Sequence, residues 1–256
     1  MIGLRKIILL VIIASAAVQA FALEGTTITL SQAQETFRAG NTAYQQQQYA
    51  AAREKYASLV DAGVKSPELF YNLGNACARL NKKGEAVLYL SRARDLDPHD
   101  PDVIANLRRV APPDVLKLLS PSHPVQWLTN RLSLREWMEL FFISFLIVGL
   151  AGGGYLASQK RPLAMRYLAL TFTAAWLLVT IFAARKYYEA YYLQYAVVIE
   201  PTASVRSGPA DKFAQVDTVP EGQIVKNLGT AEEGWTEVQL TDGRKGYVPS
   251  TQIVMI

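Results

Sequence analysis

Hydrophobic and polar positions follow four successive patterns along this chain. An unbroken apolar run covers residues 7–18, and apolar residues at helical spacing follow over residues 31–109. Two uncharged apolar stretches come next, roughly residues 140–157 and 167–184, each about 18 residues long and near the minimum that crosses a bilayer. From residue 196 onward, short β-branched runs alternate with turns that contain Gly or Pro. The chain is therefore predicted to be a multidomain protein with an all-α module, a two-span transmembrane helical hairpin and a small all-β barrel.

The N-terminal apolar run has the features of a secretory signal. Arg5 and Lys6 precede the run, and Ala20-Phe21-Ala22 fits the small-x-small cleavage pattern. We expect a signal peptide over residues 1–22, with an uncleaved membrane anchor as the alternative. Either interpretation places the segment that follows on the far side of the membrane.

An internal repeat with a period of 34 residues occupies the helical region. Similar residues recur at this spacing: Gly40 and Gly74, Ala52 and Ala86, Phe37 and Tyr71, Asn41 and Asn75, Tyr56 and Leu90. This period with helical spacing inside it is typical of tetratricopeptide repeats, and Pro98 marks the turn that ends the second copy. Residues 102–110 keep the phase and predict a capping helix. We therefore expect a tetratricopeptide module over residues 31–111.

A linker over residues 112–136 is broken by prolines and leads to the predicted membrane hairpin. Its apolar residues either lie along a membrane surface or form a packed connector. The spans are predicted at 137–157 and 167–186, joined by a loop at 158–166 that carries Lys160, Arg161 and Arg166. Basic residues favour the cytoplasmic side, so both soluble modules are expected to face the periplasm or exterior.

Two further features accompany the predicted spans. Gly149 and Gly153 form a small-xxx-small pair, which indicates either the seam of the hairpin itself or contact with a helix of a partner. Just beyond the second span lies a cluster of tyrosines whose amphipathic rings favour the membrane interface: Tyr187, Tyr188, Tyr191, Tyr192 and Tyr195.

The C-terminal region predicts a small barrel. We expect strands near 196–199, 204–206, 215–219, 223–228, 235–240, 246–248 and 253–255. The region resembles a bacterial SH3-type (SH3b) domain over residues 196–256. The resemblance rests on Val205-Arg-Ser-Gly-Pro209, Glu221-Gly222, Gly234-Trp235, Asp242-Gly243 and Gly246-Tyr-Val248. Trp235 and Tyr247 either support the barrel core and its edge or form a ligand surface.

Composition excludes several classes of chemistry. The formal charge is +4 and no Lys/Arg cluster suits nucleic acid, so no nucleic-acid partner is expected. The two histidines, His99 and His123, have no partners at ligand spacing, and Cys77 has no nearby histidine to activate it. We therefore expect no catalytic residue, no metal, no cofactor and no enzymatic activity.

The predicted binding surface is the groove lined by the first helix of each repeat. Asn side chains can donate to and accept from an extended peptide, and aromatic rings cover its side chains. In the alternative interpretation, Phe37 and Tyr71 only fill the repeat interface. The candidate groove residues are Phe37, Asn41, Tyr44, Tyr71, Asn75, Arg79, Asn106 and Arg109.

The order of segments (signal, tetratricopeptide pair, membrane hairpin, SH3-like domain) resembles the BatE-type proteins of the Bacteroides aerotolerance operon. The resemblance implies a place in the bacterial inner (cytoplasmic) membrane and membrane partners with von Willebrand A domains. It also implies a role in aerotolerance or stress. The sequence thus predicts a non-catalytic, membrane-anchored scaffold of a cell-envelope complex. The alternative is a cell-wall sensor or tether that binds peptidoglycan through the SH3-like domain.

Overall fold

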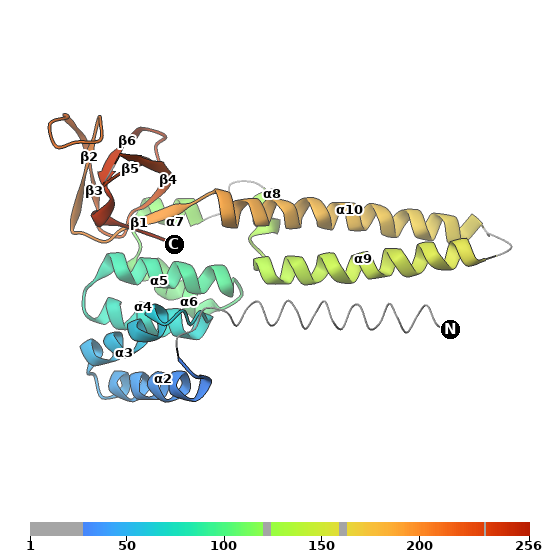
Figure 1. Ribbon diagram of the computed structural model, residues 1–256, viewed down its shortest axis with the longest axis horizontal. Helices are drawn as coiled ribbons and strands as arrows, with labels where there is room; N and C mark the ends of the chain where they lie inside the picture. Colours follow the sequence, from blue (N-terminus) through green and yellow to red (C-terminus); the bar gives the residue numbers. More distant parts are fainter. Residues whose placement is uncertain (1–27, 120–123, 159–162, 233) are drawn as a thin grey trace.

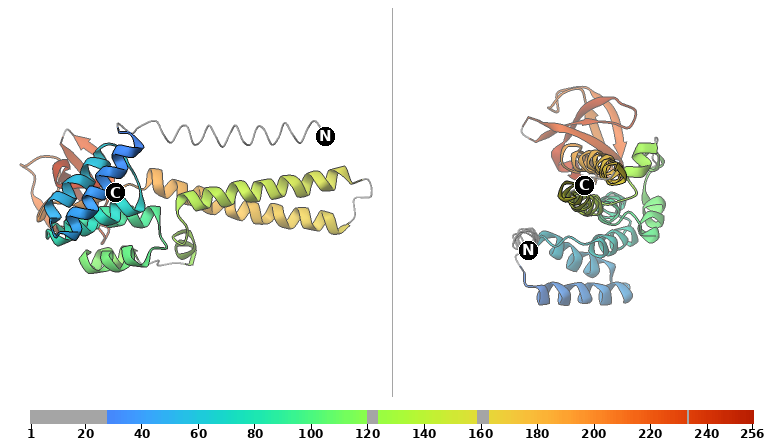
Figure 2. Two further views of the ribbon diagram at one scale, coloured as in Figure 1. Left: turned by 90° about the horizontal axis from the view of Figure 1, so that it is seen from below. Right: turned by 90° about the vertical axis from the view of Figure 1, so that its right-hand side faces the viewer.

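The computed structural model describes residues 28–119, 124–158, 163–232 and 234–256. Two soluble modules lie together at one end of a long helical hairpin (Figure 1). The left view of Figure 2 again shows the hairpin projecting away from both modules, and the right view looks along the hairpin from its end. The predicted signal peptide, His123 and the centre of the predicted cytoplasmic loop fall outside the described residues.

Five helices form the repeat module: α2 (Leu30–Gln45), α3 (Tyr49–Asp61), α4 (Pro67–Arg79), α5 (Lys83–Leu96) and α6 (Pro101–Val110). Capping residues fix where three of them begin. Thr29 and Gln32 form a capping box that satisfies free N–H groups at the start of α2. Ser66 and Asp100 cap α4 and α6, and each is followed by a proline, whose missing N–H costs nothing at the first helical position.

The two repeats share the same hairpin geometry. Gln47 and Asn81, at equivalent positions in the α2–α3 and α4–α5 turns, both adopt left-handed backbone angles, with φ of 62° and 58°. A Cβ built on Gly40 would lie 2.6 Å from Tyr56, and one built on Gly74 would lie 2.8 Å from Leu90. Only glycine permits this approach of the paired helices. The first copy, although looser in sequence, therefore folds as the second does.

The predicted membrane hairpin consists of α9 (Leu134–Ala157) and α10 (Leu163–Tyr192), preceded by the short helices α7 (Pro113–Leu119) and α8 (Pro124–Thr129). Both long helices are sufficiently long and apolar to cross a membrane. Within the most apolar segment of each helix, the rest of the protein buries 0% of the segment in α9 and 6% in α10. Aromatic side chains join the helices, including Trp137 stacked on Phe182 at 5.5 Å and Phe141 packed on Trp176 at 5.9 Å between ring centroids.

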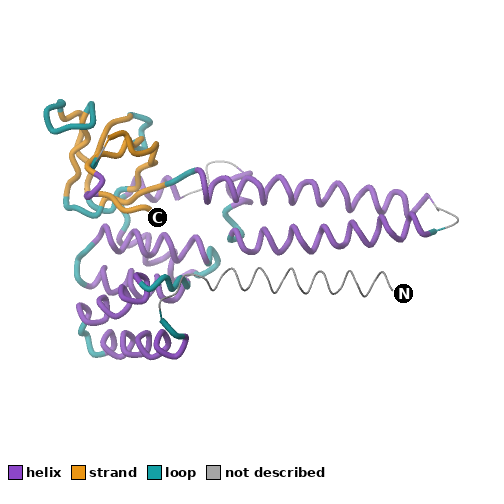
Figure 3. Tube along the Cα trace, in the orientation of Figure 1, coloured by secondary structure: helices purple, strands orange, loops and turns teal. Residues whose placement is uncertain are grey.

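A seven-stranded antiparallel sheet forms the C-terminal module, in the order β3-β2-β6-β5-β4-β1-β7. Figure 3 shows these strands in orange, gathered at one end of the molecule. Gly222 and Gly243 have positive φ angles in the turns where the sequence predicts them. Alternating buried residues fill the barrel, including Val205, Val238 and Val248. The strands are β1 (Tyr195–Val198), β2 (Thr202–Arg206), β3 (Gln215–Pro220), β4 (Ile224–Glu232), β5 (Trp235–Gln239), β6 (Lys245–Pro249) and β7 (Ile253–Met255).

The barrel packs directly on α5 of the repeat module. Val87 and Leu88 of α5 share one buried cluster with Val197 of β1, Ile224 of β4 and Val115 of α7. Polar contacts fix the same interface. The backbone N–H of Gly84 donates to Glu221 Oε1 at 2.8 Å, and Arg92 Nη2 donates to the carbonyl of Met255 at 2.5 Å. The repeat module and the barrel therefore form one unit, which we call the head, rather than two independent domains.

Candidate protein-binding surfaces

The eight candidate groove residues lie on the first helix of each repeat unit, α2, α4 and α6; we refer to them as the repeat face. Arg79 and Arg109 are exposed, whereas the other six are partly buried. Two of the eight are cations and none is a carboxylate. The surface is therefore basic at the C-terminal ends of α4 and α6.

Asparagines connect successive helices of the repeat face. Asn72 Nδ2 donates to Asn41 Oδ1 at 3.1 Å, and Asn106 Nδ2 donates to Asn75 Oδ1 at 2.9 Å. Each pair spans 31 residues, so one contact occurs twice at equivalent positions of the repeat. The Oδ1 atoms of Asn41 and Asn75 are thus already occupied. Within the described part of the chain their Nδ2 groups have no partner, which leaves two donors for a ligand.

Phe37 and Tyr71, two aromatic residues of the repeat face, both pack against neighbouring side chains. Phe37 packs on Tyr56 at 5.8 Å between ring centroids and belongs to the edge of the repeat core. Tyr71 also packs against buried residues, and its hydroxyl accepts a hydrogen bond from Asn106. The packing proposed in the alternative interpretation is therefore present for both side chains, although each remains partly exposed.

Residues that the sequence analysis missed complete this surface. Arg79 donates to the hydroxyl of Tyr49 at 2.5 Å and lies over its ring, which also contacts Tyr44. Tyr49 begins α3, outside the helices expected to line the groove. Asn72 was missed as well, although its spacing of 34 residues from Asn106 was available in the sequence.

On the barrel, Trp235 and Tyr247 occupy the outer face of neighbouring strands. Trp235 pairs with Pro249 and Glu237 with Tyr247, so the two aromatic residues are diagonal neighbours on one side of the sheet. Both are partly buried, whereas the alternate residues Thr236, Val238 and Val248 point into the core. The pair lies outside the central core of the barrel and remains a candidate ligand surface.

Cys77 lies in the repeat core and is fully buried. Its Sγ donates to Glu85 Oε2 at 3.4 Å, and Glu85 also accepts from Arg53 at 2.7 Å and Lys82 at 3.0 Å. Burial, followed by the negative charge of Glu85, raises the pKa of Cys77 to about 12. Burial alone would raise the pKa of Glu85, but the hydrogen bonds from Arg53 and Lys82 lower it overall. This thiol is protonated at neutral pH, which is unsuitable for a nucleophile.

His99 serves as a connection between the head and the hairpin. Its Nε2 lies 3.2 Å from Glu136 Oε1 at the start of α9. Across residues 28–119, 124–158, 163–232 and 234–256, no group of three His, Cys, Asp or Glu side chains could hold a metal ion. His99 is therefore placed to position α9 against the repeats.

The small-residue pair in α9 does not form the seam of the hairpin. A Cβ built on Gly149 or Gly153 would meet nothing within 4 Å, so neither glycine permits close approach of α10. The side of α9 that packs on α10 instead carries aromatic residues such as Trp137 and Phe141. The seam interpretation of this motif is wrong, and contact with a helix of a partner stays a prediction.

Amphipathic aromatic residues surround the head end of the hairpin. Trp127 of α8 is 49% exposed, and the guanidinium of Arg131 lies over its ring at 4.5 Å. The end of α10 exposes Tyr187, Tyr188, Tyr191 and Tyr192. These residue types suit the boundary between lipid and water.

The geometry thus defines a chain with two interaction modules and a pair of long apolar helices. Comparison with protein families agrees with both modules: residues 37–101 match the tetratricopeptide repeat, and residues 201–253 match the bacterial SH3 domain. A comparison with curated proteins finds no match. Tetratricopeptide and SH3 domains are typically non-catalytic, and together they support protein–protein interaction by this chain.

Proposed function

We propose that this protein is a non-catalytic, membrane-anchored scaffold that assembles proteins of the bacterial cell envelope. The observation that carries the proposal is the direct contact between α5 and the barrel at one end of the hairpin. Modules in contact lie on the same side of any membrane that α9 and α10 cross. The head therefore holds the two modules side by side, and anchoring would raise their effective concentration near membrane partners.

The repeat face is proposed as the main working surface. The free Nδ2 groups of Asn41 and Asn75 suit the carbonyl groups of an extended peptide. The exposed Arg79 and Arg109 favour a segment that carries acidic side chains. The partner segment in this proposal is an extended, acidic stretch of another envelope protein.

The proposed location is the bacterial inner membrane, with the head facing the periplasm or exterior. The basic residues of the predicted loop and the signal-like N-terminus support this orientation. The resemblance to BatE-type proteins supports membrane partners with von Willebrand A domains and a link to aerotolerance or stress. Peptidoglycan binding through the barrel is the competing function, because Trp235 and Tyr247 offer an aromatic pair on its outer face.

Replacing Asn41 and Asn75 by Asp tests the proposal. Each aspartate keeps the oxygen that accepts from Asn72 or Asn106, so the repeat fold is retained while a ligand donor becomes an acceptor. We expect capture of partner proteins to fall about tenfold, since two lost hydrogen bonds of roughly 0.5–1.5 kcal/mol each are compounded by charge repulsion. The measurement is cross-linking in intact cells followed by mass spectrometry of the co-purified proteins.

The matched control is the double variant Asn81→Asp/Asn130→Asp, which makes the same charge change at exposed positions outside the repeat face. It should capture partners as the wild type does. Equal capture by both double variants would move binding to the hairpin or barrel. Recovery of cell-wall fragments without partner proteins would support the tether instead.

A further inference from the structure

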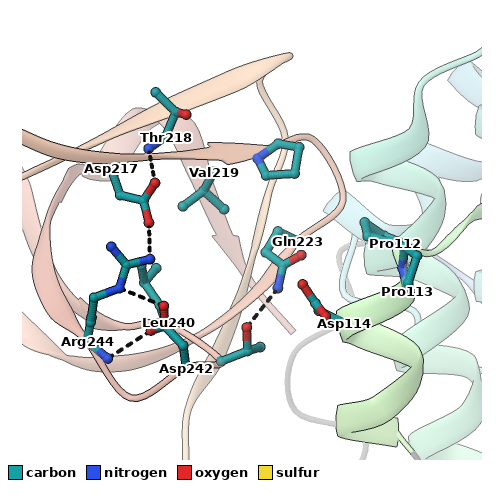
Figure 4. Close-up of a pocket in the computed structure, with 12 residues that line it drawn as sticks. Pro112, Pro113, Asp114, Asp217, Thr218, Val219, Gln223, Leu240, Asp242 and Arg244 are labelled. Atoms are coloured by element: carbon teal, nitrogen blue, oxygen red, sulfur yellow. Dashed lines mark hydrogen bonds and ion pairs between the residues drawn. The ribbon is translucent and has the colours of Figure 1, made fainter.

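Polar side chains in the cleft between the barrel and the start of α7 bind one another (Figure 4). Arg244 donates to both Asp217 and Asp242, and Gln223 donates to Thr241. The guanidinium in this cleft is therefore already neutralised by the barrel itself. Cations without such partners lie elsewhere, where the head meets the hairpin.

The junction between the head and the hairpin comprises residues 124–139 and 182–192. Helices α9 and α10 contain 24 and 30 residues, so they are about 36 and 45 Å long. A hydrocarbon core of about 30 Å that begins at the loop end of the hairpin therefore ends near Trp137 and Phe182, whose rings stack on each other. The next one or two turns of each helix then lie at the depth of the lipid headgroups.

Apolar side chains of α8 are exposed at this boundary. Val125, Trp127 and Leu128 are 47%, 49% and 39% exposed. Helix α8 is nonetheless fixed in place, because Trp137 Nε1 donates to the carbonyl of Thr129 at 3.2 Å in a buried hydrogen bond. It also lies beside the head end of α10 (Figure 1). An exposed apolar helix that is continuous with the surface of an apolar hairpin favours insertion into the same lipid layer.

Basic residues gather at the same depth. They are Arg131, Arg135, Arg185 and Lys186. Arg135 pairs with Glu139 at 2.9 Å, and Arg185 pairs with Glu189 at 3.0 Å. Within the residues that the structure describes, Arg131 and Lys186 have no carboxylate partner. Two cations of the junction are therefore available to an anion from outside the chain.

The position of Arg131 suits a phosphate group. Its guanidinium lies over the ring of Trp127 at 4.5 Å, and no described residue accepts a hydrogen bond from its side chain. The stacked ring orients the guanidinium, whose N–H groups can donate to two oxygens of one phosphate. The cation and the inserting aromatic ring thus act at one place on the membrane surface.

The usual charge bias of membrane proteins does not explain these cations. In the proposed orientation the junction faces the periplasm or exterior, whereas Lys and Arg favour the cytoplasmic side. Cations that oppose this bias indicate a negatively charged ligand. The phosphates of anionic phospholipids are anions at the depth of the junction.

We propose that the junction binds anionic phospholipids and thereby fixes the head against the membrane surface. Trp127 and Leu128 insert at the edge of the hydrocarbon, and the Arg131 guanidinium and the Lys186 ammonium bind lipid phosphates. The proposal rests on the membrane anchoring of the proposed scaffold and extends it by a lipid site. Anionic lipids then determine how firmly the head is held.

Native mass spectrometry of the full chain in neutral detergent micelles, titrated with phosphatidylglycerol or with zwitterionic phosphatidylcholine, tests lipid binding. We expect phosphatidylglycerol to bind about tenfold more tightly, because each cation near a lipid surface attracts anionic headgroups. Arg131→Gln/Lys186→Gln should lose this preference, whereas Arg131→Lys/Lys186→Arg, which keeps both charges, should retain most of it. Equal affinity for the two lipids, or unchanged phosphatidylglycerol binding by Arg131→Gln/Lys186→Gln, would overturn the proposal.

The matched control is Lys55→Gln/Lys65→Gln, which removes two exposed cations of the repeat module, away from the junction. It should bind phosphatidylglycerol as the wild type does. The Asn41→Asp/Asn75→Asp protein should also bind this lipid normally, because lipid binding requires no protein partner. Failure of the lipid site is therefore distinguishable from failure of the scaffold function.

A fluorophore on a cysteine in place of Val125, in a Cys77→Ala background, tests insertion of α8 independently. The protein is reconstituted in liposomes that contain brominated phosphatidylglycerol, whose bromine atoms quench fluorophores within the lipid layer. We expect strong quenching at position 125 and none from a fluorophore at the exposed Ser58 of α3. Equal quenching at the two positions, or none at position 125, would overturn the insertion of α8.

Discussion

Replacing Gly84 by valine separates the barrel from the repeat module. A Cβ at this position would lie 2.5 Å from the carbonyl oxygen of Val198 and 2.8 Å from the Cα of Ile199. Both obstacles are backbone atoms of the barrel, which cannot rotate away as a side chain can. The added side chain also displaces Glu221, whose carboxylate accepts from the Gly84 N–H. The whole contact must therefore open.

Loss of this contact exposes Val87, Val197 and Ile224, which are buried in the docked head. Burial of each such side chain stabilises by about 1.5–3 kcal/mol, so we expect the free energy of unfolding of the barrel to fall by roughly 3 kcal/mol or more. Urea unfolding followed through Trp235 fluorescence, with the other tryptophans replaced, measures this change. The control is Gly149→Val in α9, where an added Cβ meets nothing within 4 Å. Equal barrel stability in wild type and Gly84→Val would contradict the docked arrangement.

Cys77 resists alkylation in the folded protein. Its pKa is raised from 9.0 to about 12, mainly by burial and then by the charge of Glu85. At pH 8 a shift of this size lowers the thiolate fraction about 10³-fold, and the thiolate is the reactive species. We expect iodoacetamide to modify native Cys77 about 10³-fold more slowly than the urea-unfolded chain. A cysteine at the exposed Ser58 of α3, in a Cys77→Ala background, provides the reactive control.

The same shift predicts how stability depends on pH. The folded pKa of Cys77 lies above the unfolded value, so its contribution to stability is fully present below pH 9 and declines as the pH rises toward 12. The repeat module should lose stability in this range, and the Cys77→Ala variant should lose less.

The alkylation experiment has its own contradicting outcome. Modification of the native Cys77 thiol at a rate within tenfold of the unfolded rate would show that the repeat core opens readily.

Much of the fold was predictable because its signals are local. The strand predicted at 215–219 is observed at Gln215–Pro220, since alternating residues and a following Pro-Glu-Gly turn define it without reference to distant contacts. The 34-residue period predicted which helices pair, and Gly74 does approach Leu90. The family comparisons confirm the class of both modules, the tetratricopeptide repeats and the bacterial SH3 domain.

Docking of the barrel on α5 was missed, although one signal was present. Residues 196–199 form an unbroken apolar run, whereas a strand with one face in water alternates. All three residues Ala196, Val197 and Val198 are indeed buried, because α5 covers the side that does not face the barrel core. Such an apolar run predicts that the strand is covered on both sides. It does not predict which distant helix covers it, because local spacing carries no information on that contact.

The repeat face was only partly predictable for a similar reason. Helical periodicity placed Asn41 and Asn75 on the correct helices. It did not reveal that their Oδ1 atoms accept from Asn72 and Asn106, because such contacts depend on the spacing between helices. Gly149 and Gly153 were difficult to interpret for the same reason. A small-xxx-small pair indicates a helix face that permits close packing, but it does not predict which neighbour packs there.

Photo-cross-linking from the repeat face tests the scaffold function most directly. Benzoylphenylalanine in place of Tyr44 puts a reactive ring on this face, and the same residue in place of Lys55 puts one on the exposed side of α3. In intact membranes, we predict discrete adducts with envelope proteins from position 44, absent from position 55 and lost in the Asn41→Asp/Asn75→Asp background. The same adducts from both positions, or no adduct from position 44, would contradict a scaffold that works through its repeat face.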